Sequence, residues 1–197
     1  MQPEKIAVSE ILKSRYPLNV PIYQRGYAWE DEEIDDFIDD SLNLFRRFSN
    51  VQQKGHFFGG IVTIEHMATG HSYSLKFEIV DGQQRLATFT LVMSMIALKL
   101  RELSILAQKE GDTRTEALLN LDAVEIQDNY LFYYETDDQT ASRKQYHRLT
   151  LSQLDDAYFQ SLIRGEVTRP SRNAPASHKR LYKAAKSIQD NLGSVDI

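Results

Sequence analysis

The chain has 197 residues, the size of one domain, and this length can bury a core without disulfides or structural metals. It contains no cysteine, which excludes disulfides, thiolate nucleophiles and cysteine-ligated metal sites. No basic-then-apolar segment opens the sequence, and no apolar run is long enough to span a bilayer. These features predict a cytoplasmic protein with no membrane partner.

The formal net charge of -5 argues against a protein that coats nucleic acid non-specifically. The charge is unevenly placed, however. Eight of the eleven residues 30–40 are acidic, whereas residues 164–186 contain seven Lys or Arg and one acid. A local cationic surface on an acidic chain can still attract an anionic partner.

The first half of the sequence predicts a helix over 4–14, an extended segment at Val20–Tyr23 and an amphipathic helix over 30–48. Residues 56–66 and 73–80 are rich in β-branched and aromatic residues, which predicts an antiparallel strand pair. After Asp81-Gly82, a long helix is expected to reach Glu110, with apolar residues on more than one side.

The second half is expected to be mostly helical. We predict helices over 113–121, 124–134, 152–164 and 177–192, and a short strand at Tyr146–Leu151. Ser152 and Asp155 have the spacing of a capping box at the start of the third of these helices. The expected class is α/β (α+β), with a small mixed sheet and a dominant helical second half.

The local feature that points most directly to chemistry is the strand–turn–helix sequence Asp81-Gly82-Gln83-Gln84-Arg85. The first N–H groups of a helix lack intrahelical partners and lie at the positive end of its dipole, so they attract phosphate. Gly82 would let the backbone approach closely, and Arg85 could donate a charged fork to phosphate oxygens. The alternative is an ordinary helix start with Asp81 as the N-cap and exposed glutamines.

A second candidate segment is Val20–Trp29, which places Gln24 and Arg25 between aromatic residues. Arg25 could reach a phosphate from the side opposite Arg85, and Tyr23 or Tyr27 could supply a stacking face. For Trp29 and Tyr27 the alternative is packing of the following helix onto the core.

Three motifs together resemble the N-terminal domain of the GmrSD/SspE-type restriction proteins. They are, in the order of that family, Val20-Pro21-Ile22-Tyr23-Gln24-Arg25-Gly26-Tyr27-Ala28-Trp29, His56-Phe57-Phe58-Gly59-Gly60-Ile61-Val62, and Ile79-Val80-Asp81-Gly82-Gln83-Gln84-Arg85-Leu86-Ala87-Thr88. The similarity covers nearly the whole chain and is most specific over residues 20–90. Ala87 stands where the family usually has threonine.

The resemblance implies a ParB/sulfiredoxin-like nucleotide-binding core, expected over residues 1–112, followed by a helical subdomain over 113–197. It also implies binding and hydrolysis of a nucleoside triphosphate (GTP, ATP or another) with Mg²⁺, in bacterial defence against phage. Members of the family sense modified DNA and act with a nuclease. The five histidines here show neither H-N-H nor HExxH spacing, so the nuclease is expected in another domain or subunit.

By the same resemblance, Asp81, Gln83, Gln84 and Arg85 are the expected catalytic residues, with Asp81 also holding the metal. The expected nucleotide-binding residues are Gln24, Arg25, Gly82 and Arg85. The first motif, including Tyr23, could serve nucleotide binding, DNA sensing or both.

The basic stretch is open to two interpretations. It is either a solvated surface or a DNA contact made by Lys179, Arg180, Lys183 and Lys186 together with Arg164, Arg169 and Arg172. Two alternatives to an enzyme also remain. The domain could be a non-catalytic nucleotide- or DNA-binding switch that regulates a separate nuclease, or an interaction module whose long helix, 83–110, packs against a partner or a second copy.

Overall fold

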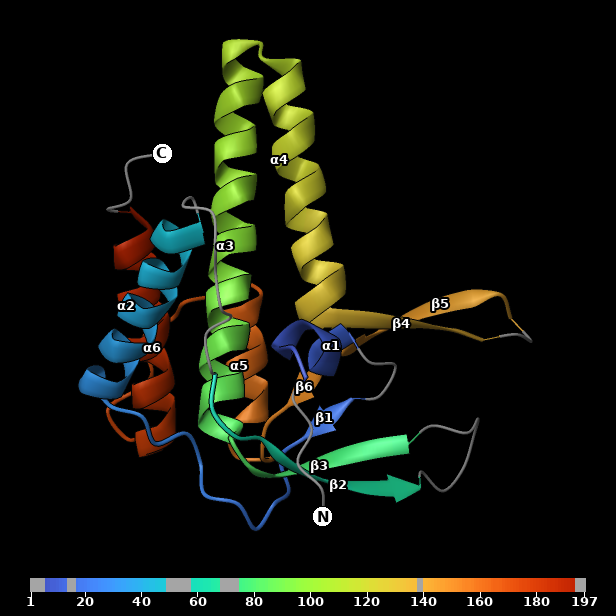
Figure 1. Ribbon diagram of the computed structural model, residues 1–197, viewed down its shortest axis with the longest axis vertical. Coiled ribbons are helices and arrows are strands. Elements are labelled where there is room, and N and C mark those ends of the chain that lie inside the picture. Colours follow the sequence, from blue (N-terminus) through green and yellow to red (C-terminus); the bar gives the residue numbers. More distant parts are fainter. Residues whose placement is uncertain (1–5, 14–16, 49–57, 68–74, 138–139, 194–197) are drawn as a thin grey trace.

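The computed structural model describes residues 6–13, 17–48, 58–67, 75–137 and 140–193. Its fold is α+β, as expected, with a four-stranded sheet, a separate two-stranded sheet and a larger helical part (Figure 1). Among the described residues, no helix is long and apolar enough to cross a membrane.

The four-stranded sheet has the order β2-β3-β1-β6. Strands β2 (Val62–Met67) and β3 (Leu75–Asp81) are antiparallel, as predicted, with a register irregularity between Val62 and Thr63. The short strands β1 (Leu18–Asn19) and β6 (Leu149–Thr150) extend the sheet in parallel to β3. Because β1 joins β3 to β6, the sheet brings the two halves of the chain together.

The central element is α3 (Gln83–Glu110), which follows β3 after one residue. Gly111 ends it in the left-handed conformation, where a residue without a Cβ has no steric penalty. Leu86, Leu91 and Met95 are buried, and the helix contacts α4, α5 and α6, so the prediction of burial on more than one side is confirmed.

Helices α4, α5 and α6 pack against α3 (Figure 1). Helix α4 (Thr113–Ile126) packs antiparallel beside it, whereas α5 (Asp156–Ile163) and α6 (Ala176–Gly193) cover its lower half. Helix α2 (Asp31–Phe48) lies against α6, and the short α1 (Val8–Lys13) contacts the π-helical turn η1 (Gln127–Leu131). The predicted break between helices near residue 122 was wrong, because α4 runs through it into η1.

The sequence did not predict the antiparallel ribbon of β4 (Phe132–Asp137) and β5 (Ser142–His147), which extends to one side (Figure 1). Residues 132–134 had been expected to continue a helix. In the structure Tyr133 and Tyr146 are cross-strand partners with stacked rings, 5.3 Å between centroids, and aromatic pairs of this kind stabilise strands.

Candidate functional site

A polar cavity of about 200 Å³ lies at the start of α3. Its lining comes from two parts of the chain that are far apart in sequence: the segment that follows β1, and the β3–α3 junction. The lining residues are Gln24, Arg25, Trp29, Val80, Asp81, Gly82, Gln83, Gln84 and Arg85. The fold therefore brings the two candidate motifs into one site.

The start of α3 is capped by Gly82 and not by Asp81. Gly82 has φ 91°, and no side chain caps this helix end among the described residues. A Cβ at Gly82 would lie 3.0 Å from the Gly60 carbonyl oxygen and 3.0 Å from Ile61 Cγ1, so the position needs glycine. The interpretation with Asp81 as N-cap was wrong, and the positive end of the helix dipole borders the cavity.

Both predicted arginines line this cavity. Arg85 Nη1 donates to the Gly60 carbonyl at 3.4 Å, and the guanidinium lies so close to Gly59 that a Cβ there would be 2.9 Å from Nε. Arg25 is exposed and enters from the opposite motif. Two guanidinium groups and a helix N-terminus thus surround one space, which suits a multiply charged anion.

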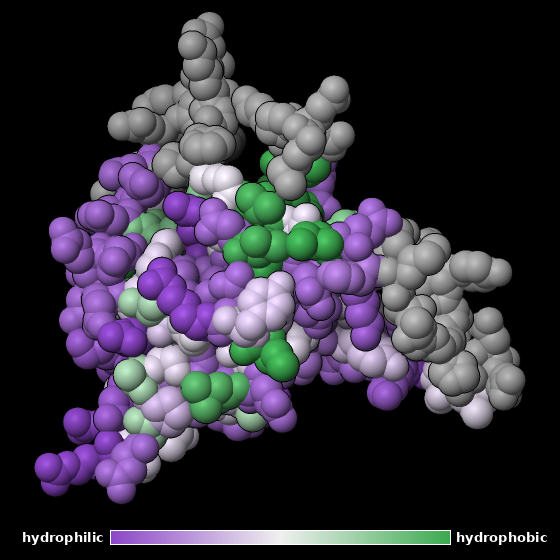
Figure 2. Space-filling model, turned by 90° about the horizontal axis from the view of Figure 1, so that it is seen from below, coloured by the Kyte–Doolittle hydropathy of each residue, from purple (hydrophilic) through white to green (hydrophobic). Residues whose placement is uncertain are grey.

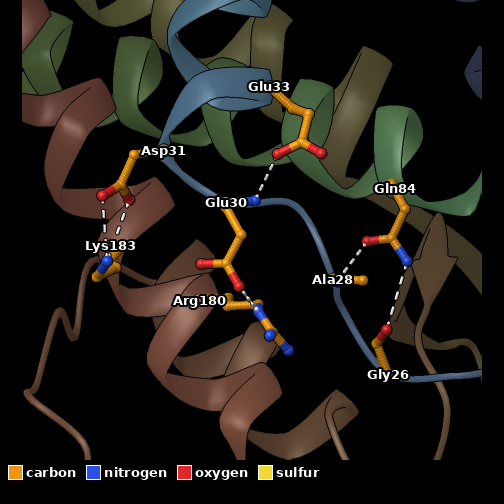
Figure 3. Close-up of polar contacts among 8 residues, drawn as sticks. All are labelled: Gly26, Ala28, Glu30, Asp31, Glu33, Gln84, Arg180 and Lys183. Atoms are coloured by element: carbon orange, nitrogen blue, oxygen red, sulfur yellow. Dashed lines mark hydrogen bonds and ion pairs between the residues drawn. The ribbon is translucent and has the colours of Figure 1, made fainter.

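Three glutamine side chains connect the two motifs. Gln84 is only 9% exposed; its Oε1 accepts from Ala28 N at 2.9 Å, and its Nε2 donates to the Gly26 carbonyl at 3.4 Å (Figure 3). Gln83 Nε2 donates to the Arg25 carbonyl at 3.0 Å, and Gln24 Nε2 donates to the Val80 carbonyl at 3.0 Å. These bonds fix the backbone that carries Arg25 beside the start of α3.

Asp81 is the carboxylate of the cavity lining, and it is exposed. Within the described ranges, no group of three or more His, Cys, Asp or Glu side chains could hold a metal ion. Mg²⁺ in nucleotide sites is commonly bound by one or two carboxylates together with substrate phosphates. Asp81 fits that type of site, and the geometry does not itself assign a metal there.

The aromatic residues of the first motif differ in their surroundings. Tyr27 is buried and its hydroxyl forms a 2.7 Å hydrogen bond with Thr88, and burial raises its pKa above the ordinary value despite that bond. Trp29 packs on Phe37 of α2, 5.7 Å between ring centroids, which confirms the packing alternative, and it also lines the cavity. Tyr23 is 70% exposed.

The surface beside the cavity includes apolar groups. Ile22 and Val80 are exposed at 82% and 36%, and Ile22 lies in the turn closed by the hydrogen bond from Gln24 N to the Pro21 carbonyl. Seen from below, this end of the molecule shows hydrophobic side chains among hydrophilic ones (Figure 2).

Comparison with protein families gives a match over residues 8–195 to the model described as GmrSD restriction endonuclease, N-terminal domain. The chain belongs to this family. A comparison with curated proteins found no match. This GmrSD N-terminal domain is therefore part of a restriction system, whose partners are DNA and a nuclease.

The basic stretch of this GmrSD N-terminal domain has a different setting from the cavity. Arg180 and Lys183 on α6 form ion pairs with Glu30 and Asp31 at the start of α2, at 2.5 and 3.1 Å (Figure 3). Lys186 pairs with Asp190 at 2.8 Å, and Lys179 donates to the Arg172 carbonyl at 2.8 Å. These four α6 residues thus have partners within the domain, and the DNA role of the basic stretch stays a prediction.

Sequence reasoning missed the importance of Asp155. Its carboxylate is 1% exposed and accepts hydrogen bonds from Tyr27 N at 2.8 Å and from Ser177 Oγ at 2.5 Å. The expected capping box with Ser152 was wrong, because Asp155 is the N-cap of α5 and makes no side-chain cap bond. No local signal could have revealed these contacts, since the partners lie 128 and 22 residues away.

Proposed function

We propose that this domain binds the phosphates of a nucleoside triphosphate in the cavity at the start of α3 and hydrolyses the terminal phosphoryl group. The observation that carries the proposal is the convergence of Arg25, Arg85 and a helix start without a side-chain cap on one cavity of about 200 Å³. Because the chain has a net charge of -5, this local positive potential is not a property of the whole surface, and it points more strongly to an anionic ligand.

In the proposed reaction, a water oxygen forms a bond to the terminal phosphorus and the bond to the bridging oxygen breaks. The products are a nucleoside diphosphate and inorganic phosphate, and the proton of the water is taken up by phosphate oxygen. Phosphoryl transfer depends mainly on positioning and charge stabilisation, which the two arginines and the helix amides would supply. Mg²⁺, held by Asp81 and the phosphates, would neutralise further phosphate charge.

The two glutamines have separable proposed roles. Gln84 uses both amide atoms on the backbone of Gly26 and Ala28, so we assign it to positioning. Gln83 uses its amide nitrogen on the Arg25 carbonyl, and no described residue bonds its Oε1. Gln83 Oε1 is therefore the acceptor that we assign to orienting the attacking water.

The test is release of inorganic phosphate by the purified protein with Mg²⁺ and each of the four common ribonucleoside triphosphates. Wild-type protein is expected to release phosphate and Arg85→Ala to release none above background. Equal rates for the two proteins would overturn the hydrolase proposal. Binding in the same samples, followed by calorimetry, decides whether a nucleotide is bound at all.

The second candidate function is a nucleotide-binding switch without turnover. Both amide atoms of Gln84 bond to the backbone, so Gln84 is not available for a reaction. The acceptors that we assign to a reaction are then only the Asp81 carboxylate and Gln83 Oε1, and this small number favours a switch. Tight nucleotide binding without phosphate release would support this function over hydrolysis.

We further propose that the DNA on which the restriction system acts is modified phage DNA and that the first motif takes part in sensing it. Tyr23 is 70% exposed and precedes the cavity-lining Gln24 in the chain, which supports its role as a contact for such a ligand. Binding of modified and unmodified duplexes of one sequence, compared for wild type and Tyr23→Ala, tests this. A Tyr23 variant that retains full discrimination would contradict it.

A further inference from the structure

The Gly26–Tyr27 peptide is held from behind by a carboxylate that belongs to another part of the fold. Asp155 accepts from Tyr27 N at 2.8 Å with one oxygen and from Ser177 Oγ at 2.5 Å with the other. It thereby connects three segments: the first motif, the start of α5 and the start of α6. Hydrogen bonds to a buried charged acceptor are stronger than neutral ones, so this junction constrains the backbone well.

The junction lies directly behind the cavity. Arg25, Gln83 and Asp155 all border a space of about 10 Å³, about the volume of one water, on the inner side of the first motif. Arg25, one residue before Gly26, also lines the outer cavity. The backbone that presents Arg25 to the cavity is therefore held by hydrogen bonds with Gln83, Gln84 and Asp155.

The close packing at Gly26 shows how little freedom this backbone has. A Cβ at Gly26 would lie 2.8 Å from Asp155 Oδ2 and 3.0 Å from Ser177 Cβ. Because Asp155 and Ser177 are both buried, neither can move into solvent to relieve the contact. Helix α6 is tied to the same stretch of chain by the Arg180–Glu30 and Lys183–Asp31 pairs (Figure 3).

We infer that Asp155 is a positioning residue of the phosphate site: its carboxylate holds the Gly26–Tyr27 peptide against α5 and α6 so that Arg25 faces the cavity. Asp155 does not line the outer cavity and touches no proposed reacting group, so its effect is exerted through the first motif. This inference rests on the proposed nucleotide site and adds the helical half of the domain to it.

The experiment compares Asp155→Ala with Asp156→Ala. Asp156 is a matched control, because its Oδ1 accepts from Leu151 N and Gln160 Nε2 and makes no contact with the first motif. Asp155→Ala is expected to weaken nucleotide binding about 10- to 100-fold, the range expected for loss of a charged hydrogen bond, with KM rising more than kcat falls. Asp155→Asn should recover much of the affinity, since an amide oxygen can still accept from Tyr27 N.

Hydrogen exchange at the Tyr27 amide gives a readout that needs no nucleotide. It should accelerate at least about tenfold in Asp155→Ala and stay unchanged in Asp156→Ala. If Asp155→Ala does not fold, Gly26→Ala decides the question, with Gly193→Ala at the end of α6 as control because a Cβ at Gly193 meets nothing within 4 Å. Gly26→Ala is expected to weaken nucleotide binding and Gly193→Ala to leave it unchanged.

The possible failures are distinguishable. If wild type binds no nucleotide, the proposed function fails, and the Tyr27 amide still reports whether Asp155 holds the motif. If wild type binds nucleotide and the Asp155→Ala and Gly26→Ala proteins bind it equally well, the positioning role is wrong and the proposed function stands.

Discussion

Two regions of the domain carry clustered cations, and the structure treats them in opposite ways. At the start of α3, Arg25 and Arg85 border a cavity beside a helix N-terminus that has no side-chain cap bond. On α6, Arg180 and Lys183 lie against the acidic start of α2 and form ion pairs with it. The cations of α6 thus make contacts within the domain, whereas the two arginines beside α3 line a cavity of about 200 Å³.

The difference shows that cation density along a sequence is a poor guide to anion binding. The acidic run 30–40 and the basic run 164–186 are far apart in sequence, yet α2 and α6 lie side by side (Figure 1). What distinguishes the α3 site is its backbone: the helix begins at a glycine in the left-handed conformation, and no side chain makes a cap bond to its first turn. The helix N-terminus adds to the two arginines in making this region suited to phosphate.

The largest effect is expected for Arg85→Ala at the cavity. Loss of its charged fork should weaken nucleotide binding about 100-fold, measured by calorimetry at constant salt. The matched control removes Lys179, Lys183 and Lys186 together and should leave nucleotide binding within about twofold, because these cations already have partners. If the triple variant weakened nucleotide binding more than Arg85→Ala does, the assignment of nucleotide binding to the α3 cavity would be contradicted.

The next effect concerns Gln84, which joins the two motifs. Gln84→Ala leaves the Ala28 N–H and the Gly26 carbonyl without this partner, and should lower the free energy of unfolding by about 2 kcal/mol. Gln83→Ala, at a partly exposed position with one bond, should cost less than about 1 kcal/mol. Denaturant titration of both variants measures this, and equal costs would mean that the buried amide is not the stronger connection.

A smaller effect is expected for the ion pairs between α2 and α6. Arg180 and Glu30 are 33% and 54% exposed, so solvent screens their attraction. A double-mutant cycle with Arg180→Ala and Glu30→Ala should give a coupling energy below about 1 kcal/mol that shrinks as salt rises. Strong DNA binding lost in Arg180→Ala, with a steep salt dependence, would instead favour this surface as a DNA contact.

The smallest effect is a pH dependence at His147, outside both regions. Burial lowers the pKa of His147, so its neutral form is favoured in the folded state. The unfolded state binds a proton first as pH falls through the ordinary value near 6.5, and the contribution of His147 to stability, present above that pH, is then lost. The difference in Tm between wild type and His147→Gln should therefore move against wild type on acidification from about pH 7.5 to 5.5, and a constant difference would contradict this.

Much of the fold could be predicted from local patterns. The β2–β3 pair, α2, the α3 boundaries and the later helices α5 and α6 follow from hydrophobic periodicity and from Gly82 and Gly111. The β4–β5 ribbon could not be predicted, because Phe132 and Tyr133 continue the helical pattern of η1 until cross-strand pairing with His147 and Tyr146 takes over. Long-range pairing of this kind leaves little trace in a short window.

The site could be predicted only in part. The residues of the two motifs do meet at one cavity, as expected, but the sequence did not separate Gln84 from Gln83. That separation depends on Gln84 facing inward on α3, where the backbone of Gly26 and Ala28 supplies its partners. The role of Asp155 likewise could not be predicted, because it depends on tertiary contacts with Tyr27 and Ser177.

The most direct test of the account is a crystal structure of the domain with Mg²⁺ and a non-hydrolysable nucleoside triphosphate. We predict phosphate oxygens within hydrogen-bonding distance of the first backbone amides of α3, with the guanidinium groups of both Arg25 and Arg85 on the same ligand. A nucleotide bound elsewhere, or one that leaves either arginine without phosphate contact, would contradict the central claim.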